Sequence, residues 1–456
     1  MTATNFSSLA LTQEMLTNLD KIGYKTMTPI QAESLPHILN KKDVIAQAKT
    51  GSGKTAAFGI GLLSNLNVKR FRVQSLILCP TRELAEQVAK ELRVLAKFAH
   101  NIKILTLIGG ESFGKQLGSL RHNAHIVVGT PGRVLKHLNK ESFDPSELNT
   151  LVLDEADRML DMGFFEEIES ILSYLPKQKQ TLLFSATYPN EILELSKKLQ
   201  NDAVMVKTTA QEVKNEIEQK FFFTEDKLQT TVALLSEYNP KNVILFCNTK
   251  IECDEVAKAL QKRDIDALAL HGDMEQYERN DVLVQFANES ARVLVATDVA
   301  ARGLDIKELE MVINYDLANT VEIYTHRIGR TARAGAKGVA LTLYTSAEEQ
   351  RVNEEFVHLD IELVQSDSLE IQKDFKMPPK YVTLVIEGGK KDKLRAGDIV
   401  GALTATKTIS FEEIGKIDLY DRQTYVAIKK EVVSKALSKL KNDKIKSKKF
   451  SVWRLD

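Results

Sequence analysis

The chain has 456 residues, enough for about three domains, carries no net charge, and with 43% hydrophobic and 27% charged residues has the composition of a globular protein. Its three cysteines form no CxxC pair and lie beside no histidine cluster, which argues against a zinc site or a disulfide framework and favours the reducing cytoplasm. The beginning, MTATNFSSLA, lacks the basic and apolar regions of a signal peptide, and no apolar run approaches the ~18 residues of a membrane span, so we expect a soluble protein without membrane contact.

Short apolar runs alternate with amphipathic helical stretches over most of the chain. Such runs between helices are typical of parallel strands that are buried on both faces of a sheet. The alternation pauses over Asn201–Glu218, which is polar, and this predicts a linker between two α/β domains in series. Ligands of such sheets gather at the carboxyl ends of the strands. The predicted strands are Val44–Ala46, Ser75–Cys79, Ile126–Gly129, Leu151–Leu153, Thr181–Phe184, Asn242–Phe246, Ala267–Leu270, Val293–Ala296 and Met311–Asn314.

A glycine-rich loop follows the first of these strands and precedes a helix. Its glycines let the backbone N–H groups point at phosphate oxygens, and the helix N-terminus adds the positive end of its dipole. Lys54 could reach the β- and γ-phosphates, and the Thr55 hydroxyl could bind Mg²⁺. A simple glycine turn is the alternative, but the string GSGKT favours an ATP site, although Ala48 stands where the general pattern has glycine. The predicted nucleotide-binding residues are Ala48, Lys49, Thr50, Gly51, Ser52, Gly53, Lys54 and Thr55.

The apolar run Leu151–Leu153 leads directly into a group of carboxylates. Asp154 at the strand end could hold Mg²⁺, commonly through water, and Glu155 could orient or deprotonate the attacking water. An acidic strand end by itself is often a solvated turn. The glycine-rich loop earlier in the same domain favours the catalytic interpretation.

Three arginines, Arg327, Arg330 and Arg333, recur at helical spacing in the second domain. One interpretation is a solvated basic helix face. The interpretation that we favour makes Arg330 and Arg333 arginine fingers, which neutralise charge on the transferring phosphoryl group once the two domains close.

Beyond the pair Pro378–Pro379 the pattern changes to βαββαβ, a ferredoxin-like layout that many RNA-binding domains share. Ile371–Asp456 carries 20 Lys and Arg against 11 Asp and Glu, a net charge of +9 against −9 for the rest. A basic tail on an acidic body indicates a polyanionic partner, although a solvated lysine-rich surface would have the same composition. The predicted elements are strands at Val382–Ile386, Ile417–Tyr420, Tyr425–Ile428 and Phe450–Leu455, with helices at Leu394–Leu403 and Glu431–Leu440. The predicted domains are 1–208, 209–375 and 376–456.

Taken together and in this order, the strings resemble those of the DEAD-box RNA helicases. Asp154–Asp157 reads DEAD, Gly23–Gln31 resembles the Q motif, and Ser185–Thr187 resembles the motif that couples ATP hydrolysis to unwinding. The resemblance implies two tandem RecA-like domains that use ATP and Mg²⁺. It further implies that Gln31 binds the adenine, Tyr24 packs near it, Asp305 binds the ribose and His326 bridges to the first domain. The expected catalytic residues are Lys54, Asp154, Glu155, His326, Arg330 and Arg333, of which Arg330 and Arg333 also touch the nucleotide.

The same resemblance implies contacts to RNA phosphates, which hold a strand without reading its bases. One line of contacts in each domain would grip a strand, and closure on ATP would separate a short duplex locally. Thr81 or Arg82 alone could equally cap a helix or lie on a solvated face. The implied RNA-binding residues are Thr81, Arg82, Gly110, Thr130 and Arg133 in the first domain and Gln276, Arg279 and Thr297 in the second.

Residues Tyr381–Asp456 resemble the RNA-binding domain of the bacterial DbpA subfamily, chiefly through Tyr381–Gly389 and Arg395–Ala402. This implies an RRM-like domain that tethers a monomeric helicase to large-subunit ribosomal RNA in pre-50S particles. The region Asp421–Ile428 lacks the glycine and paired aromatics of a base-stacking motif. We therefore expect RNA contacts at Arg422, Lys446, Lys448 and Lys449, and we expect Trp453 in the core of the domain.

Other activities fit parts of the pattern. An ATP-gated RNA clamp with little unwinding would hydrolyse ATP slowly and hold RNA for long times, whereas intact Glu155, Arg330 and Arg333 favour turnover. A general RNA helicase would show no preference for ribosomal RNA. A DNA translocase would respond to DNA, and a small-molecule P-loop kinase would not need the second α/β domain.

Overall fold

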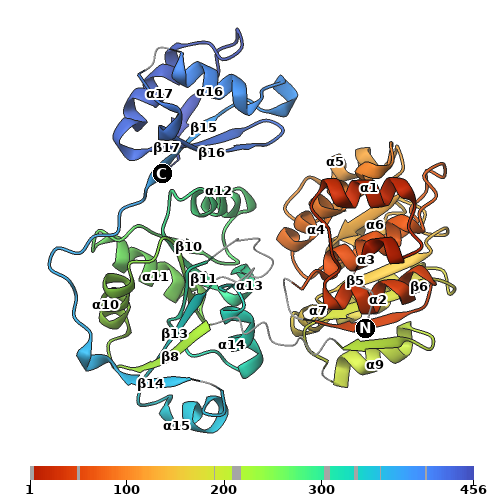
Figure 1. Ribbon diagram of the computed structural model, residues 1–456, viewed down its shortest axis with the longest axis horizontal. Coiled ribbons are helices and arrows are strands. Elements are labelled where there is room, and N and C mark those ends of the chain that lie inside the picture. Colours follow the sequence, from red (N-terminus) through yellow and green to blue (C-terminus); the bar gives the residue numbers. More distant parts are fainter. Residues whose placement is uncertain are drawn as a thin grey trace. The chain divides into compact units, whose positions relative to one another are not determined.

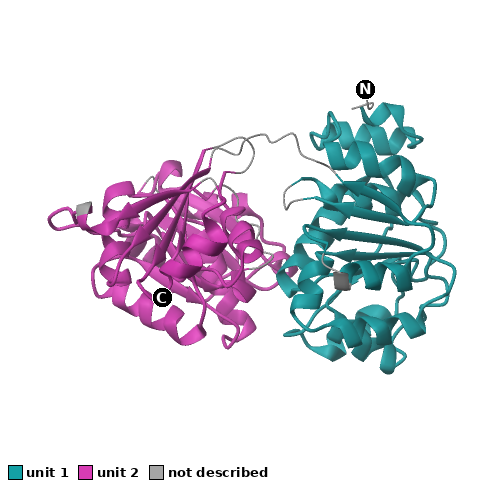
Figure 2. Cartoon of the chain, turned by 90° about the horizontal axis from the view of Figure 1, so that it is seen from below, with its two compact units in different colours: residues 1–213, 302–305 teal, residues 214–301, 306–456 magenta. Residues whose placement is uncertain are grey.

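The structure is a computed structural model that describes residues 5–48, 52–188, 190–207, 217–301, 309–332, 337–359, 361–405 and 408–455. The chain forms two compact units, Met1–Val213 with Arg302–Asp305, and Lys214–Ala301 with Ile306–Asp456 (Figure 2). The first unit contains one sheet and the second contains two (Figure 1). Among the described residues, no helix combines the length and the apolar character that a bilayer span requires.

The first unit is built on a seven-stranded parallel sheet with the order β3-β4-β2-β5-β6-β1-β7. Every residue of β2, β4, β5 and β6 is buried, because helices cover both faces of the sheet. This explains why these strands are continuous apolar runs without polar alternation. The strands are β1 (Val44–Gln47), β2 (Ser75–Leu78), β3 (Ile104–Leu107), β4 (Ile126–Gly129), β5 (Thr150–Asp154), β6 (Gln180–Ser185) and β7 (Val204–Lys207).

Helix α4 (Arg82–Leu95) buries one apolar stripe, whereas α3 (Lys54–Ser64) is buried on nearly all sides. In α4, Leu84, Val88, Leu92 and Leu95 recur every three or four residues and all join the core. Its first turn is capped by Thr81, whose Oγ1 accepts a hydrogen bond from the Leu84 N–H at 3.2 Å. The helices are α1 (Gln13–Lys21), α2 (Pro29–Leu39), α3 (Lys54–Ser64), α4 (Arg82–Leu95), α5 (Phe113–Leu120), α6 (Pro131–Asn139), α7 (Ala156–Asp161), α8 (Phe165–Tyr174) and α9 (Asn190–Leu199).

The second unit begins with another seven-stranded parallel sheet, of order β10-β11-β9-β12-β13-β8-β14. Its strands are β8 (Ile217–Phe223), β9 (Val243–Cys247), β10 (Ala267–Leu270), β11 (Val293–Thr297), β12 (Met311–Asn314), β13 (Gly338–Tyr344) and β14 (Glu362–Gln365). Its helices are α10 (Lys227–Tyr238), α11 (Lys250–Gln261), α12 (Gln276–Ala287), α13 (Asp298–Ala301), α14 (Val321–Ile328) and α15 (Glu349–Arg351). Two successive RecA-like parallel sheets confirm the predicted α/β class.

The rest of the second unit is a four-stranded antiparallel sheet of order β16-β17-β15-β18 with two helices on one face. The elements are β15 (Tyr381–Ile386), α16 (Ala396–Thr404), β16 (Ile414–Leu419), β17 (Thr424–Lys429), α17 (Val433–Asn442) and β18 (Val452–Arg454). The predicted βαββαβ order is confirmed.

Two expectations were wrong. The stretch Asn201–Glu218 is not only linker, because β7 lies inside it and pairs in parallel with β1. A four-residue edge strand is too short to stand out in a polar segment. Trp453 is not in the core: it is 38% exposed, because β18 is a three-residue edge strand. The boundary expected at residue 208 lies outside the described residues.

Candidate nucleotide and RNA site

The strand order of the first sheet separates two groups of predicted site residues. The nucleotide motifs follow β1, β5 and β6, which are neighbours on one half of the sheet. The RNA motifs follow β2, β3 and β4, which are neighbours on the other half. Because all the strands are parallel, both groups lie at the same carboxyl edge and meet between β2 and β5.

The described part of the glycine-rich loop is held by the Q-motif glutamine. Gly53 has φ +93°, and a Cβ on it would lie 2.4 Å from Gln31 Nε2, so only glycine fits. The Gln31 amide donates to the Gly53 carbonyl at 3.1 Å and accepts from the Thr28 N–H at 3.0 Å. Lys54 is buried and donates to the Ala48 carbonyl at 2.9 Å, within its own loop. Lys49, Thr50 and Gly51 lie outside the described residues.

Tyr24, which the resemblance places near the adenine, lies beside a second aromatic ring from the N-terminal segment. Phe6 is buried and meets Tyr24 edge to face, with ring centroids 6.3 Å apart. The Tyr24 hydroxyl donates to Glu91 Oε1 at 3.3 Å, and burial beside that carboxylate raises the pKa of Tyr24 to about 12. Tyr24 is therefore a neutral, oriented ring at physiological pH.

Asp154 has the properties of a cation ligand. It is 3% exposed, and its Oδ1 has no hydrogen-bond partner among the described residues. Burial raises the pKa of Asp154 to about 7, with Lys54 opposing this effect. A buried carboxylate oxygen without a partner is costly, and a hard cation such as Mg²⁺ would satisfy it. Asp154 and the half-buried Thr55 therefore fit the predicted Mg²⁺ site.

We expect Mg²⁺-dependent ATP binding to weaken about tenfold between pH 8 and pH 6. The ligand is the carboxylate form, so protonation of Asp154 below its pKa of about 7 competes with the cation. Titration of a fluorescent ATP analogue with and without Mg²⁺ at both pH values would measure this. Asp154→Asn should remove the Mg²⁺-dependent part of the pH effect. Equal affinities at pH 6 and pH 8 would contradict the assignment.

Glu155 is held in an unusual backbone conformation between β5 and α7. Its φ of 53° lies in the left-handed region, where a non-glycine residue carries strain, a feature that clusters at functional sites. Its Oε2 accepts a hydrogen bond from Arg158 Nη1 at 2.9 Å, and both side chains are buried. Sequence reasoning missed Arg158, because a charged residue one turn after the carboxylates looks like a solvated helix position.

Asp157 joins the acidic strand end to the Ser185–Thr187 segment. Its Oδ2 accepts hydrogen bonds from the backbone N–H groups of Ala186 and Thr187 and from Thr187 Oγ1, at 3.2, 2.9 and 2.9 Å. Burial opposes ionisation, but these donors hold the pKa of Asp157 below its usual value. The segment that follows β6 is therefore hydrogen-bonded to the residues that follow the strand end carrying Asp154 and Glu155.

The RNA-side residues of the first unit form a connected network. A Cβ on Gly109 would lie 2.8 Å from Arg82 Nη2, so this glycine leaves room for the arginine. Arg133 donates to Gln116 Oε1 at 3.0 Å and to the Glu111 carbonyl at 3.1 Å. Gln116 is 4% exposed and also contacts buried His137 at 3.0 Å, and sequence reasoning missed both of these. Gly110, with φ +77°, and Thr130, which begins α6, complete the set.

In the second unit the predicted RNA residues also follow neighbouring strands. Gln276 and Arg279 begin α12, which follows β10, and Thr297 ends β11, the next strand in the sheet. Gln276 Nε2 donates to Asn280 Oδ1 at 3.1 Å. The predicted RNA residues of the second unit thus follow strands at one side of their sheet, as those of the first unit do.

Arg327 lies neither on a solvated face nor at the surface. It is 1% exposed, lies over the Phe246 ring at 5.2 Å, and forms a bidentate pair with Asp298 at 2.8 and 2.7 Å. It also donates to Asn248 Oδ1 at 2.8 Å and to the Asp316 carbonyl at 2.7 Å. Arg327 therefore ties together the ends of β9, β11 and β12. Arg330 is 5% exposed and His326 half-buried, while Arg333 and Asp305 lie outside the described residues.

In the antiparallel domain, the predicted RNA residues Arg422 and Lys446 approach one lysine-rich turn. Lys446 Nζ donates to the Lys393 carbonyl at 2.9 Å, and Lys391 pairs with Asp421, next to Arg422, at 3.4 Å. Lys446, Lys448, Lys449 and Arg422 are all exposed. The structure adds Lys390, Lys391 and Lys393 to this basic surface. The sequence did not indicate that they lie near Lys446, because Lys393 and Lys446 are 53 residues apart along the chain.

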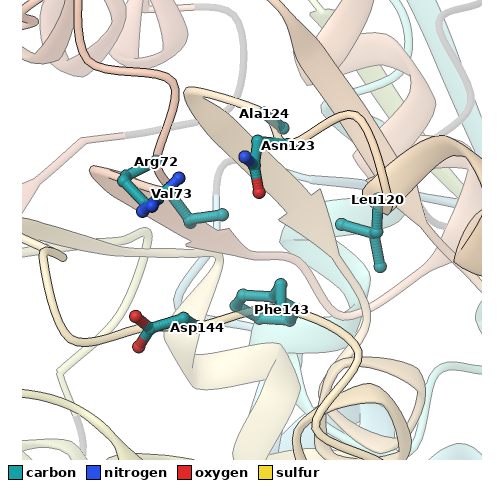
Figure 3. A pocket seen from close by; sticks show the side chains of 7 residues that line it. All are labelled: Arg72, Val73, Leu120, Asn123, Ala124, Phe143 and Asp144. Carbon is teal, nitrogen blue, oxygen red and sulfur yellow. The ribbon is translucent and has the colours of Figure 1, made fainter.

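One pocket of about 320 Å³ lies away from all these residues, at the amino edge of the first sheet (Figure 3). Val73 and Ala124, just before β2 and β4, contribute to its lining. Figure 3 shows Leu120 and Phe143 facing the same space. The pocket contains none of the predicted site residues.

Three family models match the chain. DEAD/DEAH box helicase matches residues 28–195, Helicase conserved C-terminal domain matches 226–335, and DbpA RNA binding domain matches 383–454. Each model falls on one of the three sheets, although β7, β8, β13 and β14 lie outside the matched residues.

Curated relatives match over the whole length. The ATP-dependent RNA helicase DbpA of Escherichia coli (strain K12) is 49% identical over 98% of both chains, and the protein of the same name from Bacillus subtilis (strain 168) is 37% identical over 98% of both. Among solved structures, S. cerevisiae Dbp5 bound to RNA and ADP BeF3 is 31% identical, covers 80% of this chain and 96% of its own, and has a TM-score of 0.73. Mss116p bound to ssRNA and AMP-PNP is 27% identical, covers 79% and 78%, and has a TM-score of 0.71.

Proposed function

This chain belongs to the DEAD-box family of ATP-dependent RNA helicases, and on that premise we propose that its C-terminal domain directs the enzyme to large-subunit ribosomal RNA in pre-50S particles. The chain binds ATP and RNA, and it is an RNA-dependent ATPase and helicase. The observation that carries the proposal is the exposed basic surface of Lys390, Lys391, Lys393, Arg422 and Lys446 on a domain of the DbpA type. Clustered Lys and Arg bind nucleic-acid phosphates.

The arrangement of the first unit supports a division of chemical roles. Lys54 would bind the β- and γ-phosphates after leaving the Ala48 carbonyl, and Gln31 would couple adenine to the loop through Gly53. Mg²⁺ held through Thr55 and Asp154 would neutralise phosphate charge. Glu155 would orient and deprotonate the attacking water, and Arg330 with Arg333 would stabilise the transferring phosphoryl group. His326 would link the second unit to these motifs.

The RNA network supports the coupling of hydrolysis to unwinding. Thr81, Arg82, Gly110, Thr130 and Arg133 would hold one stretch of phosphates, and Gln276, Arg279 and Thr297 would hold the next. Asp157 would transmit a change at the carboxylates to Ser185–Thr187, to which it is joined by three hydrogen bonds.

Reversal of charge at Arg422, Lys446 and Lys448, each changed to Glu, should raise the KM for large-subunit ribosomal RNA in the ATPase reaction at least about tenfold. The KM for an unrelated RNA should change much less, because the helicase domains keep their own phosphate contacts. The matched control changes Lys258, Lys262 and Arg263 to Glu, which are exposed in and just after α11 of the α/β part and alter the net charge equally.

The wild-type chain decides between the proposal and its rivals. A wild-type enzyme that does not distinguish ribosomal from unrelated RNA would be a general RNA helicase, and the proposal would fail. Slow hydrolysis with long-lived, ATP-dependent RNA binding would instead identify an RNA clamp.

A further inference from the structure

The two central strands of the antiparallel sheet are buried on both faces. On one face, Leu384 and Val426 pack against α16 and α17. On the other face, Val385 and Tyr425 lie opposite each other and are 1% and 7% exposed. The edge strands β16 and β18 are more exposed. A four-stranded domain with helices on one face would leave its other face open to solvent, so another element must cover β15 and β17 here.

That element is α12 of the preceding α/β domain (Figure 1). Val284 is 5% exposed and forms an apolar cluster with Val385 and Tyr425. The Tyr425 hydroxyl donates to Asp281 Oδ1 at 2.8 Å. Asp281 and Val284 are three residues apart and lie on one face of α12, and Asn288, the C-cap residue, follows four residues later.

A polar network closes the end of this contact. Asn288 Nδ2 donates to Thr383 Oγ1 at 2.8 Å, and the Thr383 hydroxyl donates to Ser290 Oγ at 2.9 Å. These groups are buried, with Asn288 3%, Thr383 0% and Ser290 6% exposed. Buried polar groups that are mutually satisfied specify one orientation, because any shift would leave a donor or acceptor without its partner.

At its margin the contact has complementary charge. Lys380 pairs with Glu289 at 3.0 Å, and the Tyr381 N–H donates to the Glu289 carbonyl at 3.2 Å. The acidic helicase domain thus contacts the basic C-terminal domain at Lys380 and Tyr381, where β15 begins. We name the contact of α12 and residues 288–290 with β15 and β17 the α12 dock.

The dock occupies the sheet face on which RNA-recognition domains stack bases. Tyr425 is the aromatic residue of β17 on this face, and its hydroxyl donates a hydrogen bond to Asp281 instead. The basic surface around Lys393 and Lys446 lies at a different part of the domain, at the start of α16 and the loop after α17. RNA can therefore bind the basic surface while the sheet face remains docked.

The helix that forms the dock also begins with Gln276 and Arg279. One rigid helix of 12 residues, about 18 Å long, thus joins the C-terminal domain to predicted phosphate contacts of the helicase domain. We propose that the α12 dock makes Val284, Asp281, Val385 and Tyr425 positioning residues, which fix the distance along the RNA between the segment held by the C-terminal domain and the duplex that is unwound. This inference rests on the proposed function.

A flexible attachment would have a different consequence. A domain held only by the polar segment before Pro379 would raise the local concentration of RNA without selecting where the duplex lies. The dock predicts instead that unwinding depends sharply on the spacer between the tethering RNA and the duplex.

The first test measures rigidity directly. Spin labels at Glu237→Cys and Lys435→Cys, two exposed positions in the second unit, should give a single narrow distance distribution in the full chain. The three native cysteines are free and buried. A chain without the two introduced cysteines would show whether they take up label, and they would be replaced if they do. Val284→Asp should broaden the distribution, because it places a charge in the apolar contact beside Asp281. Val357→Asp, at a valine that is 56% exposed, should leave it unchanged.

The second test measures unwinding. The substrate is the shortest fragment of large-subunit ribosomal RNA that stimulates the wild-type ATPase, joined through uridine spacers of increasing length to a short duplex. Wild-type chain should unwind efficiently only within a narrow range of spacers. Val284→Asp, and Val385→Asp from the other side, should lower kcat at the best spacer about tenfold, broaden the range, and change the KM for RNA less than about twofold, because the tether is intact.

Tyr425→Phe provides a milder variant that preserves packing and removes only the hydroxyl bonded to Asp281. It should broaden the spacer range with a smaller loss of kcat. Unchanged distance distributions and spacer dependence in all three variants would overturn the inference. If no ribosomal RNA fragment stimulates the wild type preferentially, the proposed function fails; if stimulation is selective but indifferent to spacer length, only the dock inference fails.

Discussion

Replacement of Glu155 by Gln is expected to lower RNA-stimulated ATP turnover about a thousandfold, within the range that general base catalysis supplies. The amide keeps the size of the side chain but cannot accept the proton of the attacking water. ATP binding should remain, because Lys54 and Gln31 are unchanged. The variant should therefore stay bound to RNA in the presence of ATP, and single-turnover hydrolysis together with RNA dissociation rates would measure both effects.

The control for this variant must account for the buried pair of Glu155 with Arg158 at 2.9 Å. Loss of the carboxylate leaves Arg158 with a weaker partner, so thermal unfolding of the variant should be recorded beside its kinetics. Glu166→Gln, at an exposed glutamate of α8, removes one carboxylate from the same unit without touching the site. A Glu155→Gln chain that keeps a tenth or more of wild-type turnover would exclude Glu155 as the base.

Replacement of Arg327 by Met is expected to destabilise the second unit by about 3 kcal/mol, the lower end of the cost of breaking a buried pair, because Asp298 still reaches solvent at 22% exposure. The change also removes the donors to Asn248 and the Asp316 carbonyl. For a unit of this size the melting temperature should fall by about 10 °C. Differential scanning calorimetry would measure the shift.

Two further variants separate the buried pair from a general effect of charge. Arg327→Lys keeps the charge but cannot form the bidentate pair, so its melting temperature should lie between those of the wild type and Arg327→Met. Arg263→Met, at an exposed arginine of the same unit, should leave the melting temperature unchanged. A shift below about 2 °C for Arg327→Met would contradict the structural role assigned to Arg327.

The proposed nucleotide site could be predicted from the sequence because its parts are contiguous. Gly53, Lys54 and Thr55 would act through backbone geometry and short reach, which a strand, a tight turn and a helix N-terminus determine locally. The same holds for Asp154 and Glu155 at the end of an apolar strand. The parallel sheets were predictable for a related reason, since strands buried on both faces must be continuously apolar.

Short strands and strands at the edge of a sheet could not be predicted in this way. β7 has four residues and only one buried side chain, so its sequence does not differ from that of a linker. Trp453 looked like core because large apolar side chains are usually buried, yet the edge position of β18 leaves it 38% exposed. Whether a strand lies at the centre or edge of a sheet is decided by pairing, which the strand's own residues do not encode.

The sequence by itself thus determined the fold class, the nucleotide loop and the acidic strand end, whereas the tertiary structure alone decided which charged and aromatic side chains serve as internal connections. Arg327 meets Asp298 across 29 residues, and Tyr425 meets Asp281 across 144. Neither pair has a spacing that a helix or strand repeats. The physical reason is that burial and partner choice depend on which surfaces pack together, and these contacts are specified by the whole chain rather than by any local period.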